Sequence, residues 1–183
     1  MTGAVDWSRL PPPEDDGGAR HLPGTAVPPI LLPGTHGQAV DLSCLAGTTV
    51  VYAYPMTSRP DRPVPEGWDM IPGARGCTPQ SCAFRDGHAE LRGLGVDHLF
   101  GLSTQDTAWQ AEAAARLHLS FPLLSDAALG LARALRLPVM EVEGRTLLRR
   151  LTLVIAGGRI VQVFYPVFPP DRSAADVIAW LRG

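Results

Sequence analysis

Two cysteines, Cys77 and Cys82, are the residues best suited to chemistry, because they stand five positions apart within GCTPQSCAFRD. In a reducing compartment such a close pair is more often catalytic or redox-active than structural. The third cysteine, Cys44, stands in DLSCLAG among apolar neighbours, and we expect it to be packed and inert. Three cysteines are also too few, and odd in number, for a scaffold stapled by disulfides. The candidate chemistry is therefore that of one thiol pair.

The elements predicted around this pair suit the activation of a thiol. Residues 48–54, TTVVYAY, form a β-branched and aromatic run, which indicates a central strand covered on both faces. Residues 55–76 contain five prolines and three glycines, so they must form a loop, and a loop of this length is usually functional. Residues 77–95 then predict a helix that ends at Gly93 or Gly95.

Cys77 is expected in the first turn of that helix. Backbone N–H groups at a helix N-terminus carry partial positive charge, which stabilises a thiolate. Arg75, two residues earlier, and Arg85, two turns later, are expected to add positive charge. The residues alone therefore favour Cys77 as the nucleophile and Cys82 as its disulfide partner.

Two other interpretations of the pair stay open. A tetrahedral zinc site needs four ligands, and the remaining candidates, His88 and Cys44, do not form a second closely spaced pair. Alternatively, both cysteines are packed core thiols, which suits Cys82 on an apolar helix face better than Cys77 at a loop–helix junction. We expect neither a metal nor an organic cofactor.

The rest of the chain alternates strands and helices, which predicts an α/β fold with a mixed sheet and helices on both faces. Residues 1–28 contain several Pro and Gly clusters and predict an N-terminal extension wrapped over the body, and residues 29–183 predict one domain. The expected elements are a hairpin at 29–42, a strand at 96–103, a helix at 104–119 capped by Ser103-Thr104, a strand at 121–126, a helix at 127–137, a hairpin at 147–165 turning at Gly157-Gly158, and a last helix at 174–183 capped by Asp171-Arg172-Ser173.

Composition excludes several classes of function. The chain has 183 residues, of which 45% are hydrophobic and 19% charged, as is usual for one globular unit. All 16 basic residues are arginine, so a Schiff-base lysine is excluded. A net charge of −2 gives no reason to expect nucleic acid or an anionic membrane as a partner. The chain has no membrane-length apolar run and its first residues do not resemble a secretory signal, so we expect a cytoplasmic protein.

The segments VVYAYP, GCTPQSCAFRD, FPLLSD and RLTLVI, in this order, resemble those of the peroxiredoxins, and more narrowly of their bacterioferritin-comigratory-protein or PrxQ-like branch. The resemblance covers residues 29–182, and its cysteine segment is the specific part. It implies a thioredoxin-like fold in which helices flank a central mixed sheet. It further implies Cys77 as the peroxidatic cysteine, Cys82 as the resolving cysteine and Arg150 as the arginine that supports thiolate and peroxide. The substrate-contacting residues that go with this assignment are Gly76 and Thr78.

The resemblance implies a thiol peroxidase that reduces hydrogen peroxide and organic hydroperoxides. A thiolate attacks the O–O bond, the resulting sulfenic acid condenses with the second thiol, and thioredoxin or a similar reductant reopens the disulfide. Such a protein needs no cofactor and works as a monomer or weak homodimer. A thiol–disulfide oxidoreductase and a non-catalytic redox sensor on the same fold are the alternatives, although the Cys-x-x-Cys spacing of the former is absent.

The assignment of Arg150 has one competitor. Arg149 is its neighbour, and strand alternation places the two side chains on opposite faces of a sheet. The Arg-x-Thr pattern selects Arg150, which leaves Arg149 as a solvated charge. Arg145 is expected to be a solvent-facing charge in a loop.

Two departures from the family pattern concern the loop before Cys77. The family carries Pro-x-x-x-Thr-x-x-Cys, but Met70 and Ala74 occupy the Pro and Thr positions here. The other departure is the length of residues 55–76, which form an insertion relative to the family. Three large apolar side chains of the insertion either line the thiol pocket or anchor the loop on the core. They are Trp68, Met70 and Ile71. The hydroxyls that could replace the missing threonine are those of Thr57, Ser58 and Thr78.

Overall fold

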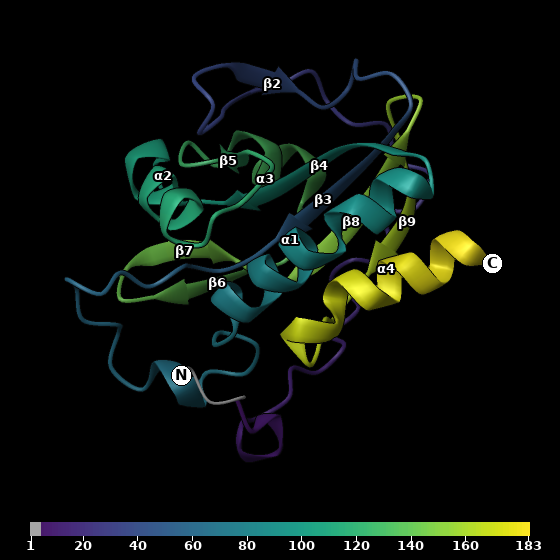
Figure 1. Cartoon of the computed structure of the whole chain (residues 1–183). Coiled ribbons are helices and arrows are strands. Elements are labelled where there is room, and N and C mark those ends of the chain that lie inside the picture. The colour runs from purple at the N-terminus through teal and green to yellow at the C-terminus, as the bar shows by residue number, and fades with distance from the viewer. Residues whose placement is uncertain (1–4) are drawn as a thin grey trace.

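A mixed five-stranded sheet forms the centre of the computed structural model, which describes residues 5–183 (Figure 1). Its strand order is β5-β4-β3-β8-β9. The middle strand, β3 (Thr48–Ala53), pairs in parallel with β4 (Val96–Ser103) and antiparallel with β8 (Leu151–Ala156). The edges are β5 (Leu123–Ser125) and β9 (Arg159–Phe164). All but the first residue of β3 is buried, which confirms the prediction from the TTVVYAY run.

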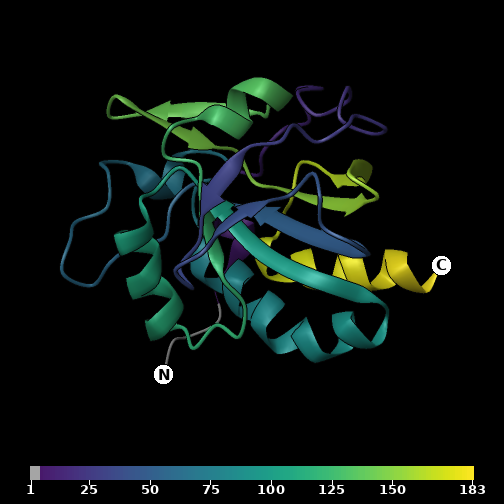
Figure 2. The ribbon, with the colours of Figure 1, turned by 90° about the horizontal axis from the view of Figure 1, so that it is seen from above.

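Helices cover both faces of this sheet, as predicted. On one face, α1 (Cys77–Gly93) and α4 (Ser173–Arg182) lie side by side and pack with α2 (Thr107–Arg116) on one core cluster. The opposite face carries the short α3 (Gly130–Leu135). Figure 2 shows these layers from above, with the sheet between α1 and α4 on one side and α3 on the other.

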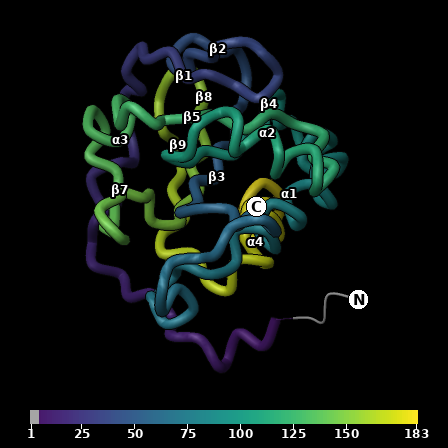
Figure 3. The backbone as a smooth tube through the Cα atoms, turned by 90° about the vertical axis from the view of Figure 1, so that its left-hand side faces the viewer, coloured from purple at the N-terminus to yellow at the C-terminus, as the bar shows by residue number. Residues whose placement is uncertain are grey.

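The N-terminal segment packs on the α3 face of the sheet. Leu22 and Val27 are buried in the same cluster as Val51 of β3, and Ala26 forms an isolated bridge with Arg159 at the start of β9. Figure 3 shows this segment in purple, continuing along the end of the molecule where the 55–76 loop lies. Side chains between residues 19 and 27 therefore belong to the core of the described structure.

The predicted hairpins are present, and one further hairpin was not predicted. β1 (Leu31–Pro33) pairs with β2 (Ala39–Asp41), and β8 turns into β9 at the two adjacent glycines, as expected. The missed hairpin joins β6 (Val139–Val142) to β7 (Arg145–Leu148) as a separate two-stranded sheet. Its turn residues, Glu143 and Gly144, both have positive φ, as a type I′ hairpin turn requires, but Glu-Gly is a weaker turn signal than Asn-Gly or Asp-Gly.

Two predicted helix caps are wrong. The side chain of Asp106, not Ser103 or Thr104, caps α2 by accepting the Trp109 N–H at 2.7 Å. Ser103 cannot do so because it ends the buried strand β4. A 3-10 turn, Pro170–Arg172, leads directly into α4, which has no side-chain cap. Within residues 5–183, none of the helices combines the length and the apolar character that a membrane crossing requires.

Candidate thiol active site

Cys77 is the first residue of α1, as predicted, and the residue is only 4% exposed. The residue before it, Gly76, has φ of 111°, a backbone conformation that favours glycine. A Cβ on Gly76 would lie 2.5 Å from a ring carbon of Pro170 and 3.0 Å from the indole of Trp7. This close packing fixes the start of the helix that carries the sulfur, and Gly76 also lines the cleft above it.

Two N–H donors point at the sulfur of Cys77. The backbone N–H of Met56 and the Nη2 of Arg150 each lie 3.4 Å from Sγ. As a thiol, the same sulfur donates to the carbonyl of Ala74 at 3.6 Å. A charged N–H donor, a neutral N–H donor and the N-terminus of a helix therefore meet at one sulfur, as they do around nucleophilic cysteines.

Arg150 is 3% exposed and holds the loop as well as the sulfur. Its Nη2 donates at 3.2 Å to each of the consecutive carbonyls of residues 73–75, and its Nη1 donates to Oε1 of Gln80. Within residues 5–183, its Nε–H is buried without a hydrogen-bond partner. The guanidinium therefore keeps one unused donor in the same buried region as the thiol. Arg149 is partly exposed and donates to the Val139 carbonyl instead.

A buried polar chain behind Arg150 was missed in the sequence. Gln80 is fully buried; it accepts from Arg150 and donates to the hydroxyl of Ser173 at 3.2 Å, which in turn lies 3.2 Å from the hydroxyl of Thr152. Gln80 stands three residues after Cys77 and so faces the same side of the helix. A polar residue three positions after the nucleophile was the feature of the sequence that could have identified Gln80.

This series of hydrogen bonds predicts that Gln80 positions the guanidinium of Arg150. We expect Gln80→Leu to lower the rate of peroxide reaction about tenfold, because Arg150 loses the acceptor that orients it, and to cost about 1–3 kcal/mol of unfolding free energy. Gln80→Glu should restore the rate, since a carboxylate also accepts from Arg150. Stopped-flow oxidation of the reduced protein and thermal unfolding measure the two effects.

Gln110 provides the matched control for that prediction. It is also fully buried and donates to the Ser103 hydroxyl and the Leu124 carbonyl, away from Arg150. Gln110→Leu should destabilise the fold by a similar amount while keeping the reaction rate of the thiol. Equal loss of rate in both variants would show that Gln80 acts only through stability.

Cys82 lies on the same helix as Cys77, half-buried, and both line one cleft. Both thiols are free in this structure. Five residues along a regular helix separate the two Cα atoms by about 8–9 Å. A disulfide needs roughly 4.4–6.8 Å, so the pair cannot be bonded while this part of α1 stays helical.

The cleft above Cys77 has a volume of about 700 Å³. Thr78 and Ser58, two of the proposed substitute hydroxyls, line it, whereas the hydroxyl of Thr57 is buried and donates to Gln105. Trp68 lines the cleft and also packs in a small core cluster, so it both borders the pocket and anchors the loop. Met70 is 67% exposed and does neither.

The two arginines expected to add positive charge near the thiol, Arg75 and Arg85, both form ion pairs with carboxylates. Arg75 is exposed and forms an ion pair with Asp69, and Arg85 pairs with Asp86. Neighbouring carboxylates therefore offset part of both charges. The arginine in hydrogen-bond contact with the sulfur is Arg150.

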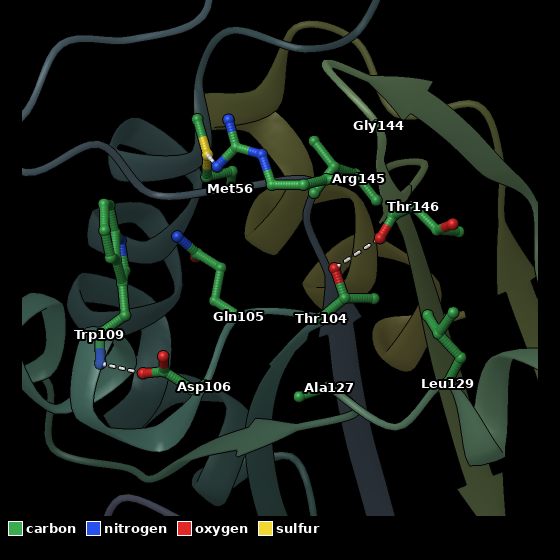
Figure 4. A pocket seen from close by; sticks show the side chains of 11 residues that line it. Met56, Thr104, Gln105, Asp106, Trp109, Ala127, Leu129, Gly144, Arg145 and Thr146 are labelled. Carbon is green, nitrogen blue, oxygen red and sulfur yellow. Dashed lines mark hydrogen bonds between the residues drawn. The ribbon is translucent and has the colours of Figure 1, made fainter.

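A second hollow of about 430 Å³ lies on the other side of Met56 (Figure 4). Arg145 reaches across it to the Met56 sulfur at 3.7 Å, and the hydroxyl of Thr104 donates to the carbonyl of Thr146 at 2.8 Å. Arg145 is exposed as expected, but it belongs to strand β7 rather than to a loop. Cys77 does not line this hollow, so the thiol chemistry belongs to the first cleft.

Aromatic residues pack between α1 and the central sheet. The ring of Tyr52 stacks on Phe84 with centroids 4.4 Å apart, and its hydroxyl donates to Ser81 at 3.1 Å. Burial raises the pKa of both Tyr52 and Tyr54 above the ordinary value of a phenol, so both stay neutral at physiological pH. Neither tyrosine therefore brings a negative charge close to the thiol.

The other cysteine and the candidate metal ligands lie apart from this site. Cys44 is exposed, and its thiol donates to the Asp41 carbonyl at 3.4 Å, so the prediction that it is packed is wrong. The turn after β2 directs it outward despite its apolar neighbours. His88 hydrogen-bonds Ser120 at 2.7 Å, and residues 5–183 bring no three His, Cys, Asp or Glu side chains together as a metal site would.

A mixed sheet between helices, with a cysteine starting the helix after the central strand, defines a protein of thioredoxin-like fold with a thiol site. Residues 22–178 match the Redoxin family, and the chain belongs to that family. Its relatives place it among the peroxiredoxins of the Q and Bcp type, which confirms the resemblance found in the sequence.

The chloroplastic peroxiredoxin Q of Oryza sativa subsp. japonica is 31% identical over 161 residues, which cover 87% of this chain and 66% of that one. Peroxiredoxin Bcp of Escherichia coli (strain K12) is 36% identical over 104 residues, 56% of each chain. Among solved structures, peroxidoxin BcpB from Mycobacterium tuberculosis is similar with a TM-score of 0.71 and 28% identity, covering 88% of this chain and 97% of the other. The chain thus spans just under two thirds of the length of the rice relative.

Proposed function

We propose that the protein is a thiol peroxidase that reduces hydrogen peroxide and organic hydroperoxides. The observation that carries the proposal is the sulfur of Cys77, which accepts from the Met56 N–H and from Arg150 at the floor of an accessible cleft. Arg150 supports it, because its guanidinium lies beside the sulfur and a positive donor there stabilises negative charge that develops on a peroxide oxygen. Plain disulfide exchange also uses a thiolate, but the Cys-x-x-Cys spacing typical of proteins that perform it is absent here.

The first step of the proposed reaction is the oxidation of Cys77 by the hydroperoxide. The thiolate of Cys77 attacks the terminal oxygen of the hydroperoxide, an S–O bond forms and the O–O bond breaks. The sulfur is oxidised by two electrons to sulfenic acid, and the leaving oxygen takes a proton to become water or an alcohol. Arg150 and the helix N–H groups stabilise the negative charge that develops on the leaving oxygen.

Recycling uses the second cysteine. The thiol of Cys82 attacks the sulfenic sulfur of Cys77, releases water and forms an intramolecular disulfide. A thioredoxin-like dithiol then reduces that disulfide by exchange, which returns both thiols. No cofactor takes part in this cycle.

Oxidation should unwind the start of α1. Because the helical separation of Cys77 and Cys82 exceeds disulfide reach, we expect amide hydrogen exchange over residues 76–86 to rise on oxidation and to fall again on reduction. Pro79, in the first turn, has no N–H to lose and does not oppose the unwinding. Exchange mass spectrometry of both states measures the change.

Cys82→Ser is the control for the unwinding. Its oxidised form cannot form the intramolecular bond, so the exchange of residues 76–86 should stay close to that of the reduced protein. Equal protection in both states of the unmodified chain, with the Cys77–Cys82 bond confirmed by mass, would contradict the proposed switch.

The proposed function itself is tested on the purified, fully reduced protein. Adding peroxide should consume two thiols per molecule with a rate constant far above that of free cysteine, and thioredoxin with its reductase should sustain turnover. Loss of thiols only at the rate of free cysteine would overturn a peroxidase. Single-turnover oxidation with no reductant able to sustain a cycle would favour a redox sensor.

We place this activity in the cytoplasm, in a monomer or weak homodimer with neither nucleic acid nor membrane as partner. The three free thiols suit a reducing compartment, and the catalytic groups come from one chain. The rice relative named above is a chloroplastic protein, so cell fractionation is the deciding measurement for location. Sedimentation of the reduced and oxidised protein decides the assembly state.

A further inference from the structure

Trp7 lies over the start of α1, on a segment that takes no part in the thiol cycle described above. Its indole N–H donates to Asp171 at 2.8 Å, and its ring packs edge-on against Phe168 with centroids 6.2 Å apart. The same ring approaches Gly76 so closely that a Cβ there would lie 3.0 Å from it. The 3-10 turn that carries Trp7 is capped by Asp6. Trp7 is therefore held in a defined position directly beside the nucleophile.

The same indole forms part of the wall of the thiol cleft. Val5 and Trp7 contribute from the N-terminal segment, and Met56, Val64 and Trp68 contribute from the 55–76 loop. These five side chains are apolar or aromatic, and they surround a volume of about 700 Å³. Pockets of that size usually take drug-sized ligands, whereas hydrogen peroxide has only its two oxygens as heavy atoms.

The charged groups at the cleft are already engaged with protein partners. Arg75 pairs with Asp69, and Asp171 accepts from Trp7. What these contacts leave for a ligand is the apolar surface of the walls and, at the floor, the donors around Cys77. This arrangement suits a molecule that is polar at one end and apolar over the rest.

We propose that Trp7 is a specificity-determining residue, whose indole favours hydroperoxides that carry a bulky apolar group, such as an aryl or branched alkyl group, over hydrogen peroxide. The inference rests on the proposed peroxidase function and adds the residue that sets the preference among peroxides. The apolar group packs on Trp7 and Val64 while the peroxide lies against Cys77. The S–O bond then forms as above, and the product is the alcohol of that apolar group together with the sulfenic acid.

Trp7→Ala tests the proposal. The second-order rate of Cys77 oxidation is measured with cumene hydroperoxide and with hydrogen peroxide, each in stopped flow on the full reduced chain. We expect the ratio of the two rates to fall about tenfold in the variant, because the aryl group loses apolar surface to bury. Trp7→Phe should keep most of the ratio. Trp180→Ala, which removes a 40% exposed tryptophan on α4, should leave the ratio unchanged.

Val64→Asp is the second variant, since Val64 is 47% exposed and tolerates a polar side chain. It should lower the same ratio by placing a charge in the part of the wall that the 55–76 loop supplies. Rates that fall equally with both peroxides in Trp7→Ala, or a ratio unchanged in both variants, would overturn the assignment of Trp7 while leaving the peroxidase intact. An unmodified protein that consumes neither peroxide would instead overturn the proposed function.

Discussion

Cys77→Ser should abolish peroxide consumption, with a loss on the order of 10³-fold or more. The hydroxyl of serine is not appreciably ionised near neutral pH, so the variant has no nucleophilic anion at this position. Residual peroxide loss in a ferrous-oxidation or coupled assay should match a protein-free blank. The fold should survive, because serine is nearly isosteric with cysteine and keeps the carbonyl of Ala74 as a hydrogen-bond partner.

The two other cysteines supply the controls. Cys44→Ser should retain full activity, since Cys44 is exposed and has no contact with the site. Cys82→Ser should keep the first turnover and lose the recycling step. If Cys77→Ser instead kept most activity while Cys82→Ser failed at the first turnover, the roles of nucleophile and resolving thiol would be reversed.

Arg150→Met has the second largest expected effect, a decrease of roughly 10²–10³-fold in the rate of Cys77 oxidation. Methionine fills much of the same buried volume but donates nothing to the sulfur, the peroxide or the carbonyls of residues 73–75. The decrease should appear in the single-turnover reaction with peroxide, and reduction of the preformed disulfide should change less. Stopped-flow oxidation and reduction, measured separately, distinguish the two steps.

Arg149→Met is the matched variant, with the same change of side chain at the adjacent position. Arg149 is partly exposed, and within residues 5–183 its partners are the Val139 carbonyl and, at 4.0 Å, Asp16, so the variant should keep its peroxide kinetics. Normal kinetics in Arg150→Met together with inactivity in Arg149→Met would transfer the role to Arg149.

Much of the fold could be predicted because local signals agree with the tertiary structure. The TTVVYAY run became the central strand, α1 ends at Gly93 as expected, and the glycines 157 and 158 turn a hairpin. The position of Cys77 at a helix start followed from the same local signals. Arg150 could be singled out only through the resemblance to a family, since its contact with Cys77 spans 73 residues of sequence.

The remaining features depend on contacts that composition and periodicity do not encode. The Met56 N–H is a backbone group, so no residue type marks it as a donor to the sulfur. Cys44 has apolar neighbours, yet the turn around Asp41 and Ser43 exposes it. Trp7 reaches Gly76 and Asp171 from the far end of the chain, and only the folded structure brings these residues together.

The reactive residues of the cleft and the residues of its walls come from different parts of the fold. This difference affects how the substrate preference of such proteins can change in evolution. Cys77 lies at the start of α1 and Arg150 lies directly before β8, where most substitutions disturb packing. The walls come from the N-terminal segment and the 55–76 loop, and surface segments of this kind accept insertions and exchanges far more readily. Selectivity can therefore evolve, or be transplanted by segment exchange, while the reaction itself is inherited unchanged with the scaffold.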